Sequence, residues 1–221
     1  MAGRLLRNFP ERILLPHDLS PKLNFSNFMK RITVSLLALF CLAASTTVHA
    51  QVDLKINPVG ILFNNLNVAA EFGLSDNFGL EVTPGFGWNK LNLDDANDYK
   101  GNIFRLGVNG RYYLNPNDKG LNGFYIGAYT RYAGGTYSYK GDTETQKYNS
   151  TRASLGFLLG GKIVARNEKL IFDFGTGFGR ALVYKFTDAN GSDEADLSDI
   201  PFLNWDIPFY ITIGYRIGGG K

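Results

Sequence analysis

The chain has a single cysteine and two histidines, and all three lie in its first fifty residues, at Cys41, His17 and His49. Residues 51–221 therefore contain no thiol that could form a disulfide or act as a nucleophile. They also contain no imidazole, the usual general base of hydrolytic enzymes. A run of about 18 apolar residues is absent, which excludes a membrane-spanning helix. We therefore expect no enzymatic activity, no catalytic residue and no cofactor.

Residues 29–50 have the layout of a secretory signal peptide. They comprise a basic start at 29–31 (MKR), an apolar run over 32–44 and a small-x-small site that ends at Ala50. We predict export through the Sec pathway and cleavage after Ala50. Residues 1–28 show no strand or helix period, and two interpretations of them stay open. They either extend the n-region of the signal, or they are an artefact upstream of a true start at Met29.

The net charge of +3 does not describe the exported part of the chain. Residues 1–50 hold six of the 23 basic residues and two of the 20 acidic ones, which leaves 17 basic and 18 acidic residues in 51–221. The expected mature chain thus has a net charge of −1, and its charge gives no reason to expect binding of nucleic acid.

Residues 170–179 (LIFDFGTGFG) show the alternation that the rest of the chain repeats. Successive side chains of a strand point to opposite faces, so Leu170, Phe172 and Phe174 share one face. The other face carries Asp173 and several glycines, beginning with Gly175. Glycine at these positions suits a cramped interior and not open water. The segment therefore predicts a strand with a wide apolar outer face and a narrow inner face.

Eight segments of this kind predict an all-β fold, an eight-stranded antiparallel up-and-down transmembrane β-barrel formed by residues 51–221. The segments are 54–63, 66–74, 79–91, 103–114, 124–137, 155–165, 170–186 and 209–217. Pro58 interrupts the first of them and cannot donate a ladder hydrogen bond. A soluble barrel of the lipocalin type is the alternative, but it would place its apolar face inside and its charges outside.

The connections alternate between short turns and long polar stretches, as in outer-membrane barrels with short periplasmic turns and long external loops. We expect the external loops at 92–101, 138–153 and 187–206. Aromatic residues gather near the strand ends, as expected for girdles at the two membrane interfaces. They are Trp88, Tyr112, Tyr113, Phe124, Tyr125, Tyr137, Tyr139, Tyr184 and Phe186.

Strand parity directs nine charged side chains into the predicted lumen. They are Lys55, Glu71, Glu81, Arg105, Arg111, Arg131, Lys162, Asp173 and Arg216. Pairing across adjacent strands predicts two clusters, one of Glu71 and Glu81 with Arg105 and Arg111, the other of Asp173 with Lys162 and Arg216. One interpretation is a salt-bridge network that fills a narrow lumen, which geometry favours in a barrel of this size. The other is a gated path for small solutes that favours anions.

The segment 187–206 is acidic and contains no lysine or arginine. Its candidate binding residues are Asp193, Glu194, Asp196, Asp199 and Trp205. The plain interpretation is a solvated surface loop. The sharper one is a loop that binds a divalent cation or a protein partner, with Trp205 as an anchor at the membrane interface or on the partner.

Residues 156–162 match the G-x-x-x-x-G-K pattern of a phosphate-binding loop. That loop requires Ser or Thr at the next position and a strand-loop-helix setting, whereas Ile163 follows here within an expected strand. We therefore do not assign a nucleotide site to this segment.

Three segments carry a resemblance to a known group of proteins. They are 56–82 (INPVGILFNNLNVAAEFGLSDNFGLEV), 123–132 (GFYIGAYTRY) and 211–217 (ITIGYRI). Together with the signal peptide and the eight alternating segments, they resemble the small, uncharacterised outer-membrane β-barrel proteins of Bacteroidetes. The layout is more distantly similar to that of OmpA and OmpX.

The resemblance implies a place in the outer membrane of a Gram-negative bacterium, in contact with outer-membrane lipids. It also implies insertion by the barrel-insertion machinery, which reads the last strand, although the tail at 218–221 departs from the usual aromatic end. The implied role is structural or in surface interactions through the external loops, with an extracellular partner that the sequence does not identify. The alternative is a small gated pore or transport channel.

Overall fold

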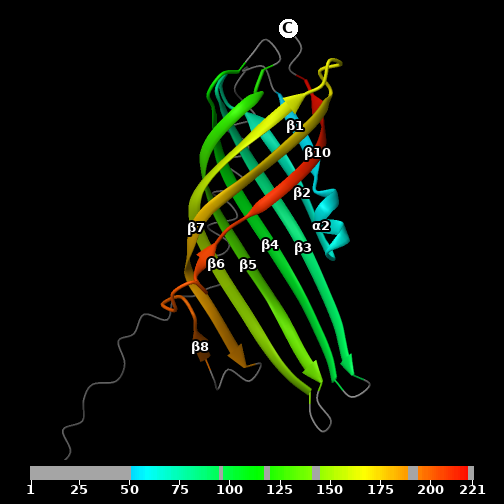
Figure 1. Ribbon diagram of the computed structural model, residues 1–221, viewed down its shortest axis with the longest axis vertical. Coiled ribbons are helices and arrows are strands. Elements are labelled where there is room, and N and C mark those ends of the chain that lie inside the picture. The colour runs from blue at the N-terminus through cyan, green and yellow to red at the C-terminus, as the bar shows by residue number, and fades with distance from the viewer. Residues whose placement is uncertain (1–50, 95–96, 117–119, 141–144, 189–193, 219–221) are drawn as a thin grey trace, which may run out of the picture. The chain divides into compact units, whose positions relative to one another are not determined.

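The computed structural model describes residues 51–94, 97–116, 120–140, 145–188 and 194–218, all within the second of two compact units of the chain. In these residues, eight strands form a ring in which each pairs antiparallel with its two neighbours (Figure 1). They are β1 (Val52–Ile56), β2 (Asn65–Gly73), β3 (Phe78–Asp94), β4 (Asn97–Tyr113), β5 (Gly123–Lys140), β6 (Thr145–Val164), β7 (Leu170–Asp188) and β10 (Phe209–Ile217). Because β10 pairs with both β7 and β1, the ring closes. The predicted eight-stranded antiparallel barrel is confirmed.

The two faces of the strands have the predicted polarity. In β7, exposed and buried residues alternate, with Phe172 and Phe174 on the outer face and Asp173 in the interior. In β10, Tyr215 lies on the outer face and Arg216 is buried. An apolar exterior around a charged interior is the opposite of what the lipocalin-type alternative requires.

The predicted first strand is wrong over its second half. β1 ends at Ile56, and a short helix, α2 (Pro58–Leu62), follows it. Pro58 occupies the start of the helix, where its missing N–H would have no intrahelical partner in any case. Asn57 caps the helix, because its side-chain oxygen accepts a hydrogen bond from the Gly60 N–H at 2.9 Å.

The predicted loops 92–101 and 138–153 are largely strand. β3 continues to Asp94 and β4 begins at Asn97, while β5 continues to Lys140 and β6 begins at Thr145. Residues 95–96 and 141–144 lie outside the described part of the chain. Paired backbones satisfy each other's hydrogen bonds whatever their side chains are, so the ladders extend beyond the part in which apolar residues alternate with polar ones.

The predicted loop 187–206 also contains strand. β8 (Glu194–Asp196) and β9 (Trp205–Asp206) each pair antiparallel with β7, on the edge that β10 occupies further along. A turn region separates β8 from β9. The eighth position of the ring is thus filled by three successive pieces of chain.

The barrel wall is of unequal height. β3 to β7 extend well beyond β1, β2 and β10, and they project past the level of α2 (Figure 1). α2 packs against β2 and β10 at the place where β1 has ended. The described residues include no helix with the length and hydropathy needed to cross a membrane.

Candidate functional site

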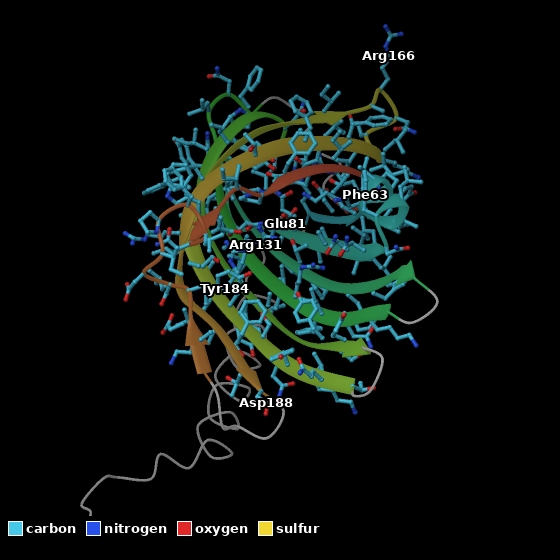
Figure 2. The ribbon with its side chains drawn as sticks, turned by 60° about the horizontal axis from the view of Figure 1, so that its bottom comes forward. Phe63, Glu81, Arg131, Arg166, Tyr184 and Asp188 are labelled. Carbon is cyan, nitrogen blue, oxygen red and sulfur yellow. The ribbon has the colours of Figure 1, made fainter. Side chains whose placement is uncertain are left out.

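The barrel interior contains a cluster of eight charged side chains, four acidic and four basic, which we call the lumen network. Its members are Asp53, Lys55, Glu71, Glu81, Arg111, Lys162, Asp173 and Arg216, and each is at most 4 % exposed. Glu71, Arg111 and Lys162 each lie two residues before the end of their strand. The network therefore lies towards the end of the barrel that carries the β2–β3, β4–β5 and β6–β7 connections, of which Arg166 marks the last in Figure 2.

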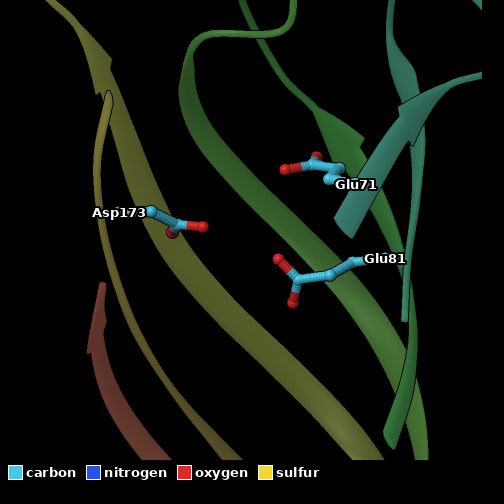
Figure 3. A group of neighbouring side chains, drawn as sticks. All are labelled: Glu71, Glu81 and Asp173. Atoms are coloured by element: carbon cyan, nitrogen blue, oxygen red, sulfur yellow. The ribbon is translucent and has the colours of Figure 1, made fainter. Parts of the chain in front are cut away.

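Two cations connect three carboxylates at the centre of the network. Oxygen atoms of Glu71, Glu81 and Asp173 come within 4.8 Å of one another, and the three side chains point towards each other (Figure 3). Lys55 Nζ contacts Glu71 Oε2 at 2.7 Å and Asp173 Oδ2 at 2.6 Å, and it also pairs with Glu81. Arg111 reaches Asp173 at 2.6 Å through Nη1 and Glu81 at 2.5 Å through Nη2.

Three converging carboxylates are a possible set of metal ligands. Here, however, the Lys55 ammonium contacts one oxygen of each, which is the position that a bound cation would take. A metal ion could bind only if Lys55 moved away. The arrangement is therefore that of an internal ion cluster whose cation is supplied by the chain.

The second half of the network is centred on Asp53. Its carboxylate pairs with Lys162 Nζ at 2.7 Å and with Arg216 Nε at 2.7 Å. Lys162 also contacts Glu71 at 3.0 Å, which joins this half to the first. Arg216 donates to the Leu121 carbonyl at 2.9 Å, and this buried leucine belongs to the β4–β5 connection. Leu121 thus ties this connection to the network.

Two tyrosines complete the hydrogen bonding of the acids. The Tyr113 hydroxyl donates to Glu71 Oε1 at 2.6 Å, and the Tyr125 hydroxyl donates to Asp173 Oδ1 at 2.7 Å. Their rings also lie close to cations, with Lys162 Nζ 4.7 Å from the Tyr113 centroid and Arg111 Cζ 4.7 Å from that of Tyr125. Both tyrosines were predicted in the aromatic girdles, and this is wrong. Each of them has the same parity as the interior residues of its own strand, and this parity places both tyrosines in the lumen.

The predicted division into two clusters differs from the observed one. The lumen network is continuous, because Lys55 and Arg111 connect Asp173 to Glu71 and Glu81, and Lys162 connects Glu71 to Asp53. Arg216 pairs with Asp53, a residue that sequence reasoning missed. Asp53 has the same parity as Lys55 and could have been found by starting the first strand two residues earlier.

Arg105 and Arg131, also predicted in the lumen, lie apart from the lumen network. Arg105 donates to Asn65 Oδ1 at 2.7 Å. Arg131 pairs with Asp206 at 3.3 Å, and Arg152, which the sequence placed in a loop, approaches the same carboxylate at 3.8 Å. The predicted pairing of Arg105 with Glu71 and Glu81 is therefore wrong. Figure 2 shows Arg131 and Glu81 on the hollow side of the curved sheet.

The acidic candidates of segment 187–206 are spread out. Asp196 accepts hydrogen bonds from the Ser198 hydroxyl and from the Ser198 N–H at 2.9 Å, and these lower the pKa of its carboxyl. Trp205 packs on Phe178 and Phe202, and Asp199 is exposed. Asp193 and the side chain of Glu194 lie outside the described part of the chain. Among the carboxylates that are described, those of this segment do not form a group that could hold a metal.

Known structures with a similar fold are outer-membrane barrels. The attachment invasion locus protein Ail of Yersinia pestis has a TM-score of 0.50 at 7 % identity, over 77 % of this chain and 100 % of Ail. A major outer membrane protein from Thermus thermophilus has a TM-score of 0.41 at 16 % identity, over 76 % of this chain and 98 % of that one. The translocator domain of the autotransporter NalP from Neisseria meningitidis has a TM-score of 0.40 at 13 % identity, over 86 % of this chain and 70 % of that one.

No curated protein matches the sequence. One family does, under the description "Protein of unknown function (DUF3575)", and the match extends over residues 34–197. The chain therefore belongs to the DUF3575 family.

Proposed function

We propose that this chain is an integral, non-enzymatic protein of the Gram-negative outer membrane, with a structural or surface-interaction role. Its apolar outer face would contact outer-membrane lipids, and the barrel-insertion machinery would place it there after Sec export and cleavage behind Ala50. The absence of histidine and cysteine from residues 51–221 supports a role without catalysis.

The observation that carries the proposal is the lumen network. Four acids and four bases balance each other in charge, and their side chains are almost completely buried across the lumen. An eight-stranded barrel is only just wide enough for side chains to fill it. A lumen filled in this way favours a closed barrel, in which specificity would come from the extended parts of β3 to β7 and from segment 187–206.

Planar-bilayer recording of the purified, refolded protein tests this function. We expect no steady conductance from the unmodified protein. Cell fractionation tests the location, since an integral barrel stays in the membrane through salt and carbonate washes and leaves it only in detergent. Release of the protein by carbonate alone would refute the location.

A small gated pore is the second candidate. It is favoured by a cavity of about 520 Å³ next to the lumen network, which Arg105 and Arg131 line. Opening would require the network to separate. Reproducible open-pore currents from the unmodified protein would support the pore over the closed barrel.

A further inference from the structure

The cavity beside the lumen network crosses the barrel interior from one wall to the other. On one side it is bounded by α2, β2 and the residues leading into β10, and on the other by β4, β5 and β6. Residues that line it include Val59, Phe63, Arg105, Arg131, Leu158 and Tyr210. Its volume of about 520 Å³ is within the range of small-molecule sites, roughly 300–1,000 Å³.

The barrel wall is interrupted beside this cavity. The last residue of β1 that pairs with β10 is Ile56, opposite Ile213, so Phe209 to Thr212 have no β1 residue beside them. α2 packs there in place of a strand, and it has no buried residue. A five-residue helix cannot continue the ladder of hydrogen bonds on both sides. The wall therefore has fewer backbone hydrogen bonds here than where neighbouring strands pair.

Three apolar side chains near this interruption line the cavity and are also exposed, beside the polar Asn57, Asn65 and Asn67 that line it too. Phe63, Ile207 and Phe209 line the cavity, yet they are 68 %, 61 % and 69 % exposed. Figure 2 shows Phe63 at the edge of the barrel and Arg131 in its interior. These three side chains would thus offer apolar contacts to an alkyl chain that enters the cavity from the surrounding lipid.

The wall opposite the interruption is positively charged. Arg105 and Arg152 lie in register on either side of Ala133 in β5, and Arg131 lies two residues along the same strand. Arg105 and Arg131 line the cavity, whereas Arg152 lies beside them and lines a neighbouring hollow. Among the described carboxylates that line the cavity, Glu81 belongs to the charge-balanced lumen network, and Asp206 pairs with Arg131 and Arg152. Arg105 bonds to the neutral Asn65 side chain, and Arg152 Nε is buried without a hydrogen-bond partner. Because a guanidinium stays charged, this wall has a surplus of positive charge that an anion would neutralise.

We propose that the cavity binds an anionic amphiphile, a molecule with a carboxylate or phosphate head and an alkyl chain. The head would pair with Arg105 and Arg131, and the chain would extend towards Phe63, Ile207 and Phe209. Guanidinium groups bind both heads through paired hydrogen bonds. The head could come from a free fatty acid or from a phospholipid, and these two sources share the same chemistry.

Binding titrations with purified protein in a nonionic detergent test the inference. The probes are dodecanoate, dodecyl phosphate, dodecanol, acetate and inorganic phosphate. We expect dodecanoate and dodecyl phosphate to bind at least about tenfold more tightly than dodecanol, because hydrogen bonds to a charged group are lost with the alcohol. The tighter of the two anions identifies the source of the head group.

A pair of variants locates the site. Arg105→Gln should weaken dodecanoate binding by about tenfold or more. Arg166→Gln, the matched loss of charge in the exposed β6–β7 turn, should leave it unchanged. The melting temperature of each variant checks that its fold is kept, and the comparison of probes on the unmodified protein holds even if a variant does not fold.

Three results would overturn the inference. Equal binding of dodecanol would mean that the arginines do not matter, and equal binding of acetate or inorganic phosphate would mean a site for soluble anions. Equal loss in Arg105→Gln and Arg166→Gln would place binding elsewhere. The inference rests on the proposed membrane location, but the two can fail separately, since carbonate extraction tests location without any ligand.

Discussion

Lys55 shows at the scale of one residue how the barrel interior tolerates buried charge. Its ammonium contacts carboxylates from three other strands, β2, β3 and β7. A buried charge is costly unless partners of opposite charge surround it, and removing one partner leaves the others uncompensated. The burial of each charge in the lumen network therefore depends on the other members, although the network does not drive folding.

Removal of Asp173 should be costly, because it pairs with Lys55 and Arg111 and accepts a hydrogen bond from Tyr125. We expect Asp173→Ala to lower the free energy of unfolding in detergent by roughly 3–5 kcal/mol, as for other buried pairs that lose one partner. Urea titration measures the change. Asp199→Ala, on an exposed carboxyl of segment 187–206, should change it by less than about 0.5 kcal/mol. Similar stability of both variants would mean that water enters and solvates the network.

The sequence predicts which charges point inward, and the predicted pairing of Arg111 with Glu71 and Glu81 is confirmed, but the partners of Asp173 are not those predicted. Strand parity is a local property, and it places Glu71, Arg111 and Asp173 in the lumen. Pairing was expected between adjacent strands, whereas Arg111 on β4 reaches Asp173 on β7, across the lumen. In so narrow a barrel, long side chains span the interior, and their partners depend on the stagger of the strands. That stagger is a property of the closed ring and cannot be predicted from the sequence of a single strand.

At the scale of the element, close contact between β6 and β7 explains why glycines occupy the inner faces of these two strands. A Cβ at Gly156 would lie 2.6 Å from Gly179 Cα and 2.7 Å from the Tyr129 ring. The missing side chains on these strands thus leave room for tyrosines of the adjacent strands β5 and β10, which agrees with the cramped interior predicted from residues 170–179.

Gly156→Ala should therefore destabilise the barrel by roughly 1–3 kcal/mol, through overpacking of a filled interior. Gly107→Ala provides the control, because a Cβ there would meet its nearest neighbours at 3.7 Å, an ordinary contact. Thermal unfolding followed by circular dichroism compares the two. Equal melting temperatures would show that the β6–β7 contact can relax at little cost.

The helix α2 is the element that sequence reasoning did not find. The alternation of residues 54–63 favoured a strand, whereas Pro58 disfavoured one. The proline was decisive, because it is favourable at the first position of a helix and cannot donate a hydrogen bond to a strand ladder. By contrast, β10 was predicted with its observed bounds, since uninterrupted alternation runs from Phe209 to Ile217. Elements whose local pattern and pairing agree can be predicted, whereas α2 depends on the early end of β1.

The Asn57 cap offers a direct test of α2. Asn57→Ala removes the acceptor for the Gly60 N–H and should cost about 1 kcal/mol, whereas Asn57→Ser keeps an oxygen at the cap and should cost less. Hydrogen exchange of residues 58–63 measures the effect locally. Faster exchange in both variants, or in neither, would show that the cap does not hold the helix.

At the scale of the whole molecule, the lumen network decides whether the barrel conducts. Arg111 has the largest side chain among the fully buried residues, and it connects β4 to β3 and β7. Without it, the network keeps four acids and three bases and has a net charge of −1. Arg111→Ala should therefore both open space in the lumen and leave a surplus of negative charge there.

We expect Arg111→Ala to produce small, steady currents in planar bilayers that favour cations over anions, whereas the unmodified protein stays closed. The reversal potential in a salt gradient gives the preference, and its sign follows from the surplus carboxylate. Arg105→Ala is the matched control, because it removes an arginine from the cavity beside the network and leaves all eight network residues in place. If Arg111→Ala is as silent as Arg105→Ala, then the β4–β5 connection, held by the Leu121 carbonyl on Arg216, seals the lumen by itself. If the unmodified protein already conducts, the network is a gate and the barrel is a pore.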